Sequence, residues 1–132
     1  MKRFLYQYFP LFAVIVIIFF FSSLVIVPGP KFFNNQDKVL HFLAFFALGY
    51  TLFRIFSYRS IPFFKGAILV IVLTSLYGLS DEIHQLYVPN REFDWYDLLA
   101  DFLGSFVSVL IGQKLFKLDR YFASFFFKVN PY

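Results

Sequence analysis

The stretch from residue 8 to residue 27 reads YFPLFAVIVIIFFFSSLVIV and contains no charged side chain. It is followed by Pro28-Gly29-Pro30, a sequence that does not continue a helix. An α-helix needs about 20 predominantly apolar residues to cross the hydrocarbon core of a bilayer. This stretch therefore predicts a membrane-spanning helix near the N-terminus.

Three more apolar stretches of spanning length follow, separated by short polar segments. The four predicted helices cover about residues 8–27, 39–56, 61–87 and 95–116. Strands of a membrane barrel would alternate apolar and polar residues with a period of two, and these runs do not. We therefore predict an all-α membrane protein, a bundle of four transmembrane helices that forms a single domain over residues 1–132.

The amino-acid composition supports a membrane protein. Of the 132 residues, 60% are hydrophobic and 15% are charged, and the mean hydropathy is +0.69. Soluble domains are about 45–50% apolar and about 25% charged, so the composition argues against a soluble protein. The formal net charge is +4, but the basic residues are scattered between apolar runs, so we expect no nucleic-acid partner. The chain has no cysteine, which excludes disulfides and thiolate metal sites.

The basic residues predict the orientation of the bundle. With four spans, nine of the 12 Lys and Arg residues fall on the side of the two termini, and Lys31, Lys38 and Arg91 fall on the other side. Loops rich in Lys and Arg stay in the cytoplasm. We therefore predict that both termini are cytoplasmic and that the segments around Lys31 and Arg91 lie outside.

The acidic residues fall the opposite way. Only Asp119 is predicted on the cytoplasmic side. The others lie at the outer ends of the second, third and fourth helices or in the loop between the last two: Asp37, Asp81, Glu82, Glu92, Asp94, Asp97 and Asp101. Acidic residues contribute little to membrane orientation, so this grouping is independent information and predicts a site.

Helix capping explains some of these acids but not all. Asp94 suits an N-cap, and Asp97 lies at the capping-box position three residues later. Asp81 and Glu82 lie at a helix C-terminus, where they oppose the helix dipole, and Asp101 lies a turn deeper than any cap. Ionisable groups within membrane segments are costly and usually functional. We therefore expect the acids that capping leaves unexplained to have a function.

The candidate site combines these acids with neighbouring polar residues. It comprises Asp37, Lys38, His41, Asp81, Glu82, His84, Gln85, Arg91, Asp94, Asp97 and Asp101. We expect Lys38 and Arg91 to orient or neutralise the carboxylates, and His41 and Gln85 to supply hydrogen bonds. The excess of acids leaves three solutions open: protonated carboxylates, cations that bridge several carboxylates, or a metal ion or cationic ligand. We assign no catalytic residue, no cofactor-binding residue and no metal ligand, and the cofactor stays unknown.

Four segments of the chain resemble the VanZ-like family of bacterial integral membrane proteins. They are DKVLHF at 37–42, SLYGLSDEIHQ at 75–85, VPNR at 88–91 and DWYDLLADFLG at 94–104. The resemblance covers about residues 35–112, with two departures: Asp101 stands where the family usually has Asn, and Asn90 stands where Gly is common. The resemblance implies a multi-pass protein of the bacterial cytoplasmic membrane in a cell-envelope setting. The family is named after an accessory membrane protein linked to teicoplanin-type glycopeptide resistance, so a link to glycopeptide susceptibility is one expectation, although membership implies neither a reaction nor that this chain confers resistance.

From the residues and the resemblance together, we predict that the acidic site at the outer face binds an envelope component. That component would be a lipid-linked or peptide group that carries a cation, and the lipid bilayer is the other expected partner. Two alternatives stay open. The protein could be a membrane-embedded enzyme that acts on a lipid-linked envelope substrate, with Asp81 or Glu82 and His41 as acid and base, with or without a metal. The cluster could instead be purely structural and lock three helix ends together.

Overall fold

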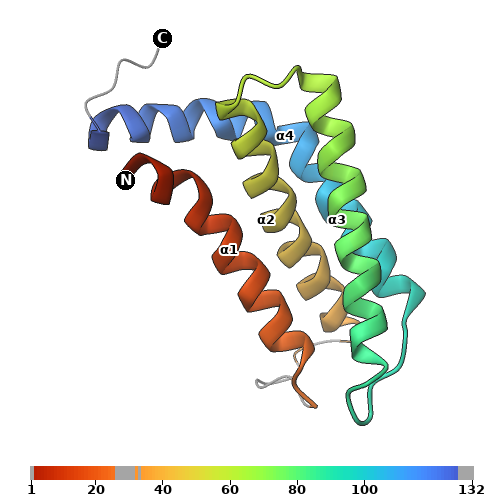
Figure 1. Cartoon of the computed structure of the whole chain (residues 1–132). Helices are drawn as coiled ribbons and strands as arrows, with labels where there is room; N and C mark the ends of the chain where they lie inside the picture. The colour runs from red at the N-terminus through yellow and green to blue at the C-terminus, as the bar shows by residue number, and fades with distance from the viewer. Residues whose placement is uncertain (1, 26–31, 33, 128–132) are drawn as a thin grey trace.

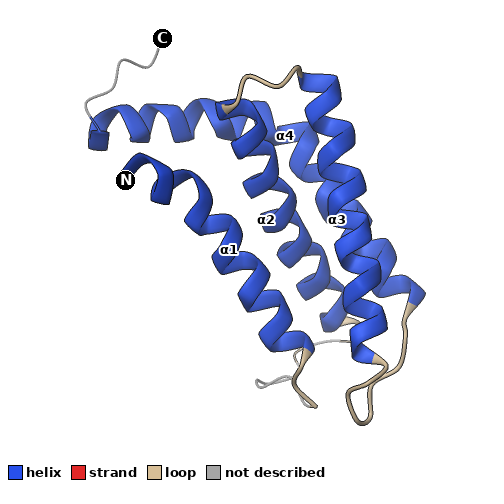
Figure 2. Cartoon of the chain, viewed as in Figure 1, coloured by secondary structure: helices blue, strands red, loops and turns tan. Residues whose placement is uncertain are grey.

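The computed structural model describes residues 2–25, 32 and 34–127. Within these residues the chain forms four α-helices and no strand (Figure 2). They are α1 (Lys2–Ser22), α2 (Gln36–Tyr58), α3 (Phe63–Gln85) and α4 (Trp95–Phe127). Each helix is long and apolar enough to cross a membrane, which confirms the predicted all-α bundle of four spans. The side of the membrane on which the termini lie stays a prediction.

Two helix ends differ clearly from the predicted ones. α1 begins at Lys2 rather than near residue 8, and α4 runs to Phe127 rather than to about residue 116. Hydropathy marks the part of a helix that suits the bilayer interior, whereas backbone hydrogen bonding can continue into polar surroundings. The predicted end of the first helix, Val27, lies outside the described residues.

Helix α2 occupies the centre of the bundle (Figure 1). It contacts the three other helices and makes its most extensive contact with α4. Apolar side chains fill the space on both sides of α2, with Ile18, Phe45 and Leu48 packed between α1 and α2, and Phe53, Val70 and Val109 packed among α2, α3 and α4. Many large apolar side chains on the outside of the bundle are exposed, which is expected of a surface that faces lipid tails.

Small residues allow α2 and α4 to approach closely. A Cβ on Gly104 would overlap the backbone oxygen of Phe42. A Cβ on Gly49 would lie 3.2 Å from Cα of Ser105, and both Ser105 and Ser108 are fully buried along this seam. Membrane helices commonly pack through small residues, because lipid tails offer no hydrophobic driving force for their association. The seam fixes the rotation and the register of α4 against α2.

The C-terminal part of α4 turns away from the direction of the bundle. Figure 1 shows it running across the end at which α1 begins and α2 ends. A polar network joins it there, since the Asp119 carboxylate accepts hydrogen bonds from Arg54 Nε at 2.8 Å and from the Tyr58 hydroxyl at 2.7 Å. The Tyr6 hydroxyl donates to the same carboxylate at 2.6 Å, and the Arg54 guanidinium lies over the Tyr6 ring. The one acid that the sequence sets apart from the others is thus the partner of a buried arginine.

Candidate functional site at the acidic end

We call the end of the bundle at which α2 begins, α3 ends and α4 begins the acidic end. It lies opposite the end where α1 begins and the last part of α4 crosses the bundle (Figure 1). Hydrogen bonds and the 3.8 Å contact between His41 and Asp97 connect ten of the eleven candidate residues here into one continuous cluster. The ten are Asp37, Lys38, His41, Asp81, Glu82, Gln85, Arg91, Asp94, Asp97 and Asp101.

His84 is the candidate residue that the structure leaves out of this cluster. Its Nε2 lies 3.0 Å from the hydroxyl of Ser23, and its ring packs on Phe19 with 5.0 Å between the ring centres. The side chain therefore faces α1 rather than the carboxylates. On α3, residues 81, 82 and 85 are buried in the bundle, whereas residue 84 is half-buried at the side that meets α1.

Lys38 lies among three carboxylates. Its ammonium donates to Asp37 Oδ2 at 2.9 Å, to Asp97 Oδ1 at 2.7 Å and to Asp94 Oδ2. The hydrogen bond from the Lys38 ammonium lowers the pKa of Asp94 below its ordinary value. Asp94 also begins α4 as expected of an N-cap, since its Oδ1 accepts a hydrogen bond from the backbone of Tyr96 at 2.8 Å. Lys38 therefore places one positive charge among Asp37, Asp94 and Asp97, which form the rim of the cluster.

His41 and Asp101 form a buried pair below this rim. Nδ1 of His41 lies 2.9 Å from Oδ1 of Asp101, whose side chain has no solvent exposure. The other carboxylate oxygen, Oδ2, has no hydrogen-bond partner among the described residues. A Cβ on Gly78 would lie 2.8 Å from this oxygen, so glycine at that position makes room on α3 for the carboxylate.

The second nitrogen of His41 faces two more carboxylates. Nε2 lies 3.8 Å from Asp97 Oδ2, and one atom each of His41, Glu82 and Asp97 lie within 4.8 Å of one another. Glu82 is fully buried, and its Oε2 accepts a hydrogen bond from the backbone N–H of Asp94 at 2.8 Å. These three side chains could hold a metal ion, a role that the sequence analysis did not assign to them.

A second group of acids has the spacing of a metal site but already contains a cation. Asp37, Asp94 and Asp97 each offer a carboxylate oxygen within 4.8 Å of the others. The ammonium of Lys38 bonds to all three of them. It therefore takes the position that an ion would need, which leaves the group around His41 as the better candidate.

Arg91 reaches the carboxylates through Gln85. Its Nη1 donates to Gln85 Oε1 at 3.0 Å, and Gln85 Nε2 donates to Asp81 Oδ2 at 3.1 Å and to Glu82 Oε1 at 3.4 Å. Arg91 Nε also donates to the backbone oxygen of Leu24 at 3.3 Å, just beyond α1. Within residues 2–25, 32 and 34–127 it forms no ion pair with a carboxylate and contacts the carboxylates only through the amide of Gln85.

The cluster holds more buried negative charge than its cations neutralise. Asp81, Glu82, Asp97 and Asp101 are each at most 6% exposed. Among the ion pairs of the described residues, Lys38 reaches only Asp97 of these four. A buried carboxylate without a counter-charge is strongly unfavourable, so such a group takes up a proton or a cation. The arrangement is therefore suited to binding a cation or to exchanging protons.

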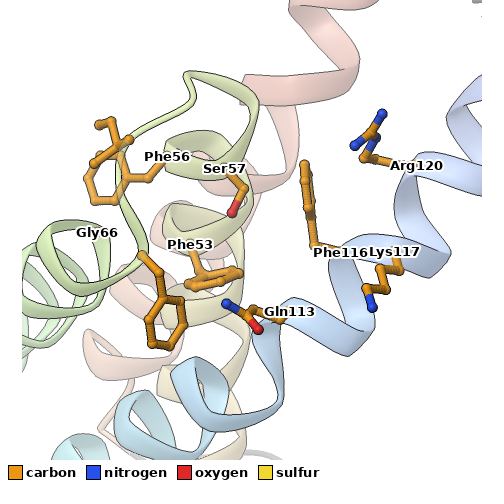
Figure 3. Close-up of a pocket in the computed structure, with 10 residues that line it drawn as sticks. Phe53, Phe56, Ser57, Gly66, Gln113, Phe116, Lys117 and Arg120 are labelled. Atoms are coloured by element: carbon orange, nitrogen blue, oxygen red, sulfur yellow. The ribbon is translucent and has the colours of Figure 1, made fainter. Parts of the chain in front are cut away.

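A cavity of about 430 Å³ lies at the opposite end of the bundle, away from the acidic residues. Figure 3 shows side chains from α2, α3 and α4 around it, among them Phe53, Gln113 and Phe116. None of the eleven candidate residues lines it. No local sequence pattern marks this space, because it results from how aromatic side chains of three helices meet near Gly66.

The sequence did not indicate one part of the acidic end, which is the backbone at the end of α1 and just beyond it. The carbonyl oxygens of Phe21 and Leu24 accept hydrogen bonds from Arg91. The Phe21 carbonyl also accepts a hydrogen bond from the backbone N–H of Leu24 at 3.2 Å, and Leu24 itself lies beyond the last residue of α1, where carbonyls have no partner within the helix. The end of the first apolar stretch is the only sign of this segment in the sequence. It does not indicate that Arg91 lies beside it.

Comparison with known proteins gives one match. The model of the family described as VanZ/LLP1 matches residues 4–117, a range that contains all eleven candidate residues. Searches of curated proteins and of solved structures found no match.

Proposed function

The chain belongs to the VanZ/LLP1 family, and we propose that it binds a component of the bacterial cell envelope at the acidic end of its bundle. The component is a lipid-linked or peptide group that brings positive charge to the buried carboxylates. In this proposal the protein is a multi-pass protein of the cytoplasmic membrane, with both termini in the cytoplasm and the acidic end on the outer side.

The unbalanced negative charge of the cluster carries this proposal. Four carboxylates are buried, and Lys38 is the only lysine or arginine that pairs directly with one of them among the described residues. Burial without compensation destabilises the fold, and residues that destabilise a fold are often kept for function. A positively charged ligand would remove the imbalance when it binds.

The distribution of charge along the chain supports the outward orientation. By their positions relative to the four apolar runs, nine of the 12 basic residues are predicted on the side opposite the acidic one. Basic segments remain in the cytoplasm, so the acidic end would face the envelope. Reporter fusions after Lys31, Ser60, Arg91 and Lys128 test this orientation, and we expect the positions outside, inside, outside and inside. A cytoplasmic signal at Arg91 would contradict the proposal.

A binding measurement tests the function itself. The purified chain in lipid nanodiscs is titrated with a lipid-linked peptide that bears a free lysine amine and with the same probe after N-acetylation. We expect the acetylated probe to bind at least about tenfold more weakly, a difference of about 1.4 kcal/mol. Glu82→Gln should weaken binding of the free amine, whereas Glu92→Gln, which changes an exposed acid at the same end, should not. Equal binding of both probes would overturn the proposal.

The proposal includes an effect on glycopeptide susceptibility. Binding of an envelope component at the outer face would change which envelope molecules a glycopeptide antibiotic encounters at that face. We expect deletion of the gene to change susceptibility to teicoplanin-type glycopeptides, and we expect wild-type protein but not the Glu82→Gln variant to restore it.

A second candidate function is a membrane-embedded enzyme that acts on a lipid-linked envelope substrate. The observation that favours it is the position of His41 Nε2, 3.8 Å from Asp97 Oδ2 and close to Glu82. A histidine beside carboxylates can exchange protons with a substrate as general acid and base. Incubation of the purified chain with labelled lipid-linked precursors distinguishes the two functions, because only an enzyme yields a product.

A further inference from the structure

The imidazole of His41 is held in the orientation that is common among metal ligands. With Asp101 ionised, Nδ1 of a neutral His41 ring carries the proton and donates it to Oδ1 at 2.9 Å. The free lone pair is then on Nε2, and Asp97 Oδ2 lies 3.8 Å from this nitrogen. Histidine ligands of metals usually donate their other N–H to a carboxylate or carbonyl in this way.

The three facing side chains are close to the separation that an ion requires. Zinc bonds to nitrogen and oxygen are about 2.0–2.2 Å long, which places tetrahedral ligand atoms about 3.4 Å apart. The donor atoms of His41, Glu82 and Asp97 already lie within 4.8 Å of one another. Glu82 is fully buried and Asp97 is 6% exposed, so an ion between them would be shielded from competing water.

The carboxylate that holds His41 is itself short of a partner. Asp101 has no solvent exposure, and its Oδ2 has no hydrogen-bond partner among the described residues. A cation on Nε2 would make the Nδ1–H of His41 a stronger donor and so stabilise the Asp101 carboxylate behind it. The neighbouring group around Lys38 needs no ion, because an ammonium already fills it.

We infer that the acidic end binds one divalent transition-metal ion through His41 Nε2, Glu82 and Asp97, with Asp101 positioning His41. One imidazole and two carboxylates favour Zn²⁺ or Mn²⁺ over Ca²⁺ and Mg²⁺, which take oxygen ligands. The inference rests on the proposed function for the role of the ion: the metal supplies positive charge to the cluster. Three protein ligands leave a coordination position open to an oxygen atom of the envelope component.

Metal titration of the purified full chain tests this inference. The protein, in detergent with its affinity tag removed, is stripped with a chelator, dialysed and titrated with Zn²⁺ and Mn²⁺, with Ca²⁺ as the control ion. We expect one bound transition-metal ion per chain by elemental mass spectrometry. We expect Ca²⁺ to bind at least about tenfold more weakly, since it lacks the preference for an imidazole ligand.

Variants locate the ion. His41→Ala, Glu82→Gln and Asp97→Asn should each lower the affinity at least about tenfold, and Asp101→Asn should lower it about tenfold through the orientation of His41. The matched controls are His84→Ala, the only other histidine of the chain, and Glu92→Gln, an exposed acid at the same end. Both controls should bind like wild type. Far-ultraviolet circular dichroism checks that each variant is folded, and cobalt substitution gives an absorption spectrum that should change in Asp101→Asn.

The outcomes separate this inference from the proposed function. Metal binding that does not depend on His41, or that His84→Ala abolishes, would overturn the inference. Suppose that the stripped protein takes up no metal ion in the titration but still binds the amine probe. The proposed function then stands and the inference fails. If one metal ion binds through His41 but neither lipid-linked probe binds, the inference stands and the proposed function fails.

Discussion

The carboxylate of Asp101 joins α4 to α2 through only one of its two oxygens. Oδ1 lies 2.9 Å from Nδ1 of His41, while Oδ2 has no hydrogen-bond partner among the described residues. A buried polar atom without a partner costs about 1–3 kcal/mol. The pair therefore orients the histidine at the expense of stability, which suits a binding site better than a structural lock.

Replacement of Asp101 tests this interpretation. In Asp101→Asn the amide oxygen can still accept from His41, and the buried charge is lost. We expect an unchanged or higher melting temperature in detergent with chelator present, together with loss of the cellular phenotype in a complementation assay. A marked fall in melting temperature would mean that the carboxylate stabilises the bundle, and it would favour the purely structural alternative.

Glu82→Gln should also leave the melting temperature unchanged or higher, because it too removes a buried charge and keeps a hydrogen-bond acceptor. The glutamine oxygen can accept the hydrogen bond from the backbone N–H of Asp94 that Glu82 accepts at 2.8 Å. Neutralising one of four buried carboxylates relieves repulsion among them, so we expect unchanged or higher thermal stability. The melting curve of the purified variant checks this, and a loss comparable to that of a broken buried ion pair, about 3–5 kcal/mol, would contradict it.

Arg91→Gln should destabilise the bundle. The guanidinium donates to Gln85 and to the backbone oxygens of Phe21 and Leu24, so it ties the end of α1 to the acidic end. Hydrogen bonds that involve a charged group contribute about 1.5–3 kcal/mol, and we expect a loss in that range. Arg59→Gln is the control, because Arg59 is exposed and its hydrogen bonds go to the Tyr8 hydroxyl. Equal losses in both variants would argue against this role.

The Arg54–Asp119 pair should stabilise the other end of the bundle. Arg54 is 3% exposed, and its Nε lies 2.8 Å from Asp119 Oδ2. Asp119→Ala should lower the free energy of unfolding by about 3–5 kcal/mol, since it leaves a buried guanidinium unpaired. The double variant Arg54→Met/Asp119→Ala should recover part of that loss. A double-mutant cycle from chemical unfolding checks the coupling, and additive effects would show that the pair does not act as a unit.

Gly104→Ala and Gly66→Ala form a matched test of the seam between α2 and α4. The new methyl group on residue 104 would overlap the backbone oxygen of Phe42, so the two helices would have to separate. The new methyl group on residue 66 would lie 3.7 Å from Cβ of Phe56, an ordinary contact. We expect Gly104→Ala to lose at least about 1–3 kcal/mol or to fail to fold. We expect Gly66→Ala to keep or gain stability, because alanine favours a helix by about 0.8–1 kcal/mol over glycine.

Much of this architecture follows from local patterns in the sequence. Continuous apolar runs predict four spans because the bilayer imposes one length on every helix that crosses it. The grouping of acids at one end follows from their positions relative to those runs. The same runs place Lys38, just before the second predicted helix, at the same end of the bundle as Asp94 and Asp97, at the start of the fourth.

The partners within the acidic end could not be read in the same way. His41 meets Asp101, Arg91 meets Gln85 instead of a carboxylate, and His84 turns towards α1. These pairings depend on the rotation of each helix about its axis and on its shift along a neighbour. Both are set by which backbones can touch, and hydropathy contains no information about that.

The distant pairing of Arg54 with Asp119 has the same origin. The charge pattern separates Asp119 from the other acids but gives it no partner, because Asp119 lies 65 positions after Arg54 in the sequence. The bend of α4 brings them together (Figure 1). Hydrophobicity along the chain thus determines how many helices cross the membrane and where the charges lie in depth. Close packing of Gly49, Gly104 and the seam between α2 and α4 determines which charges meet, since contact between helices requires a complementary shape that exists only once they are assembled.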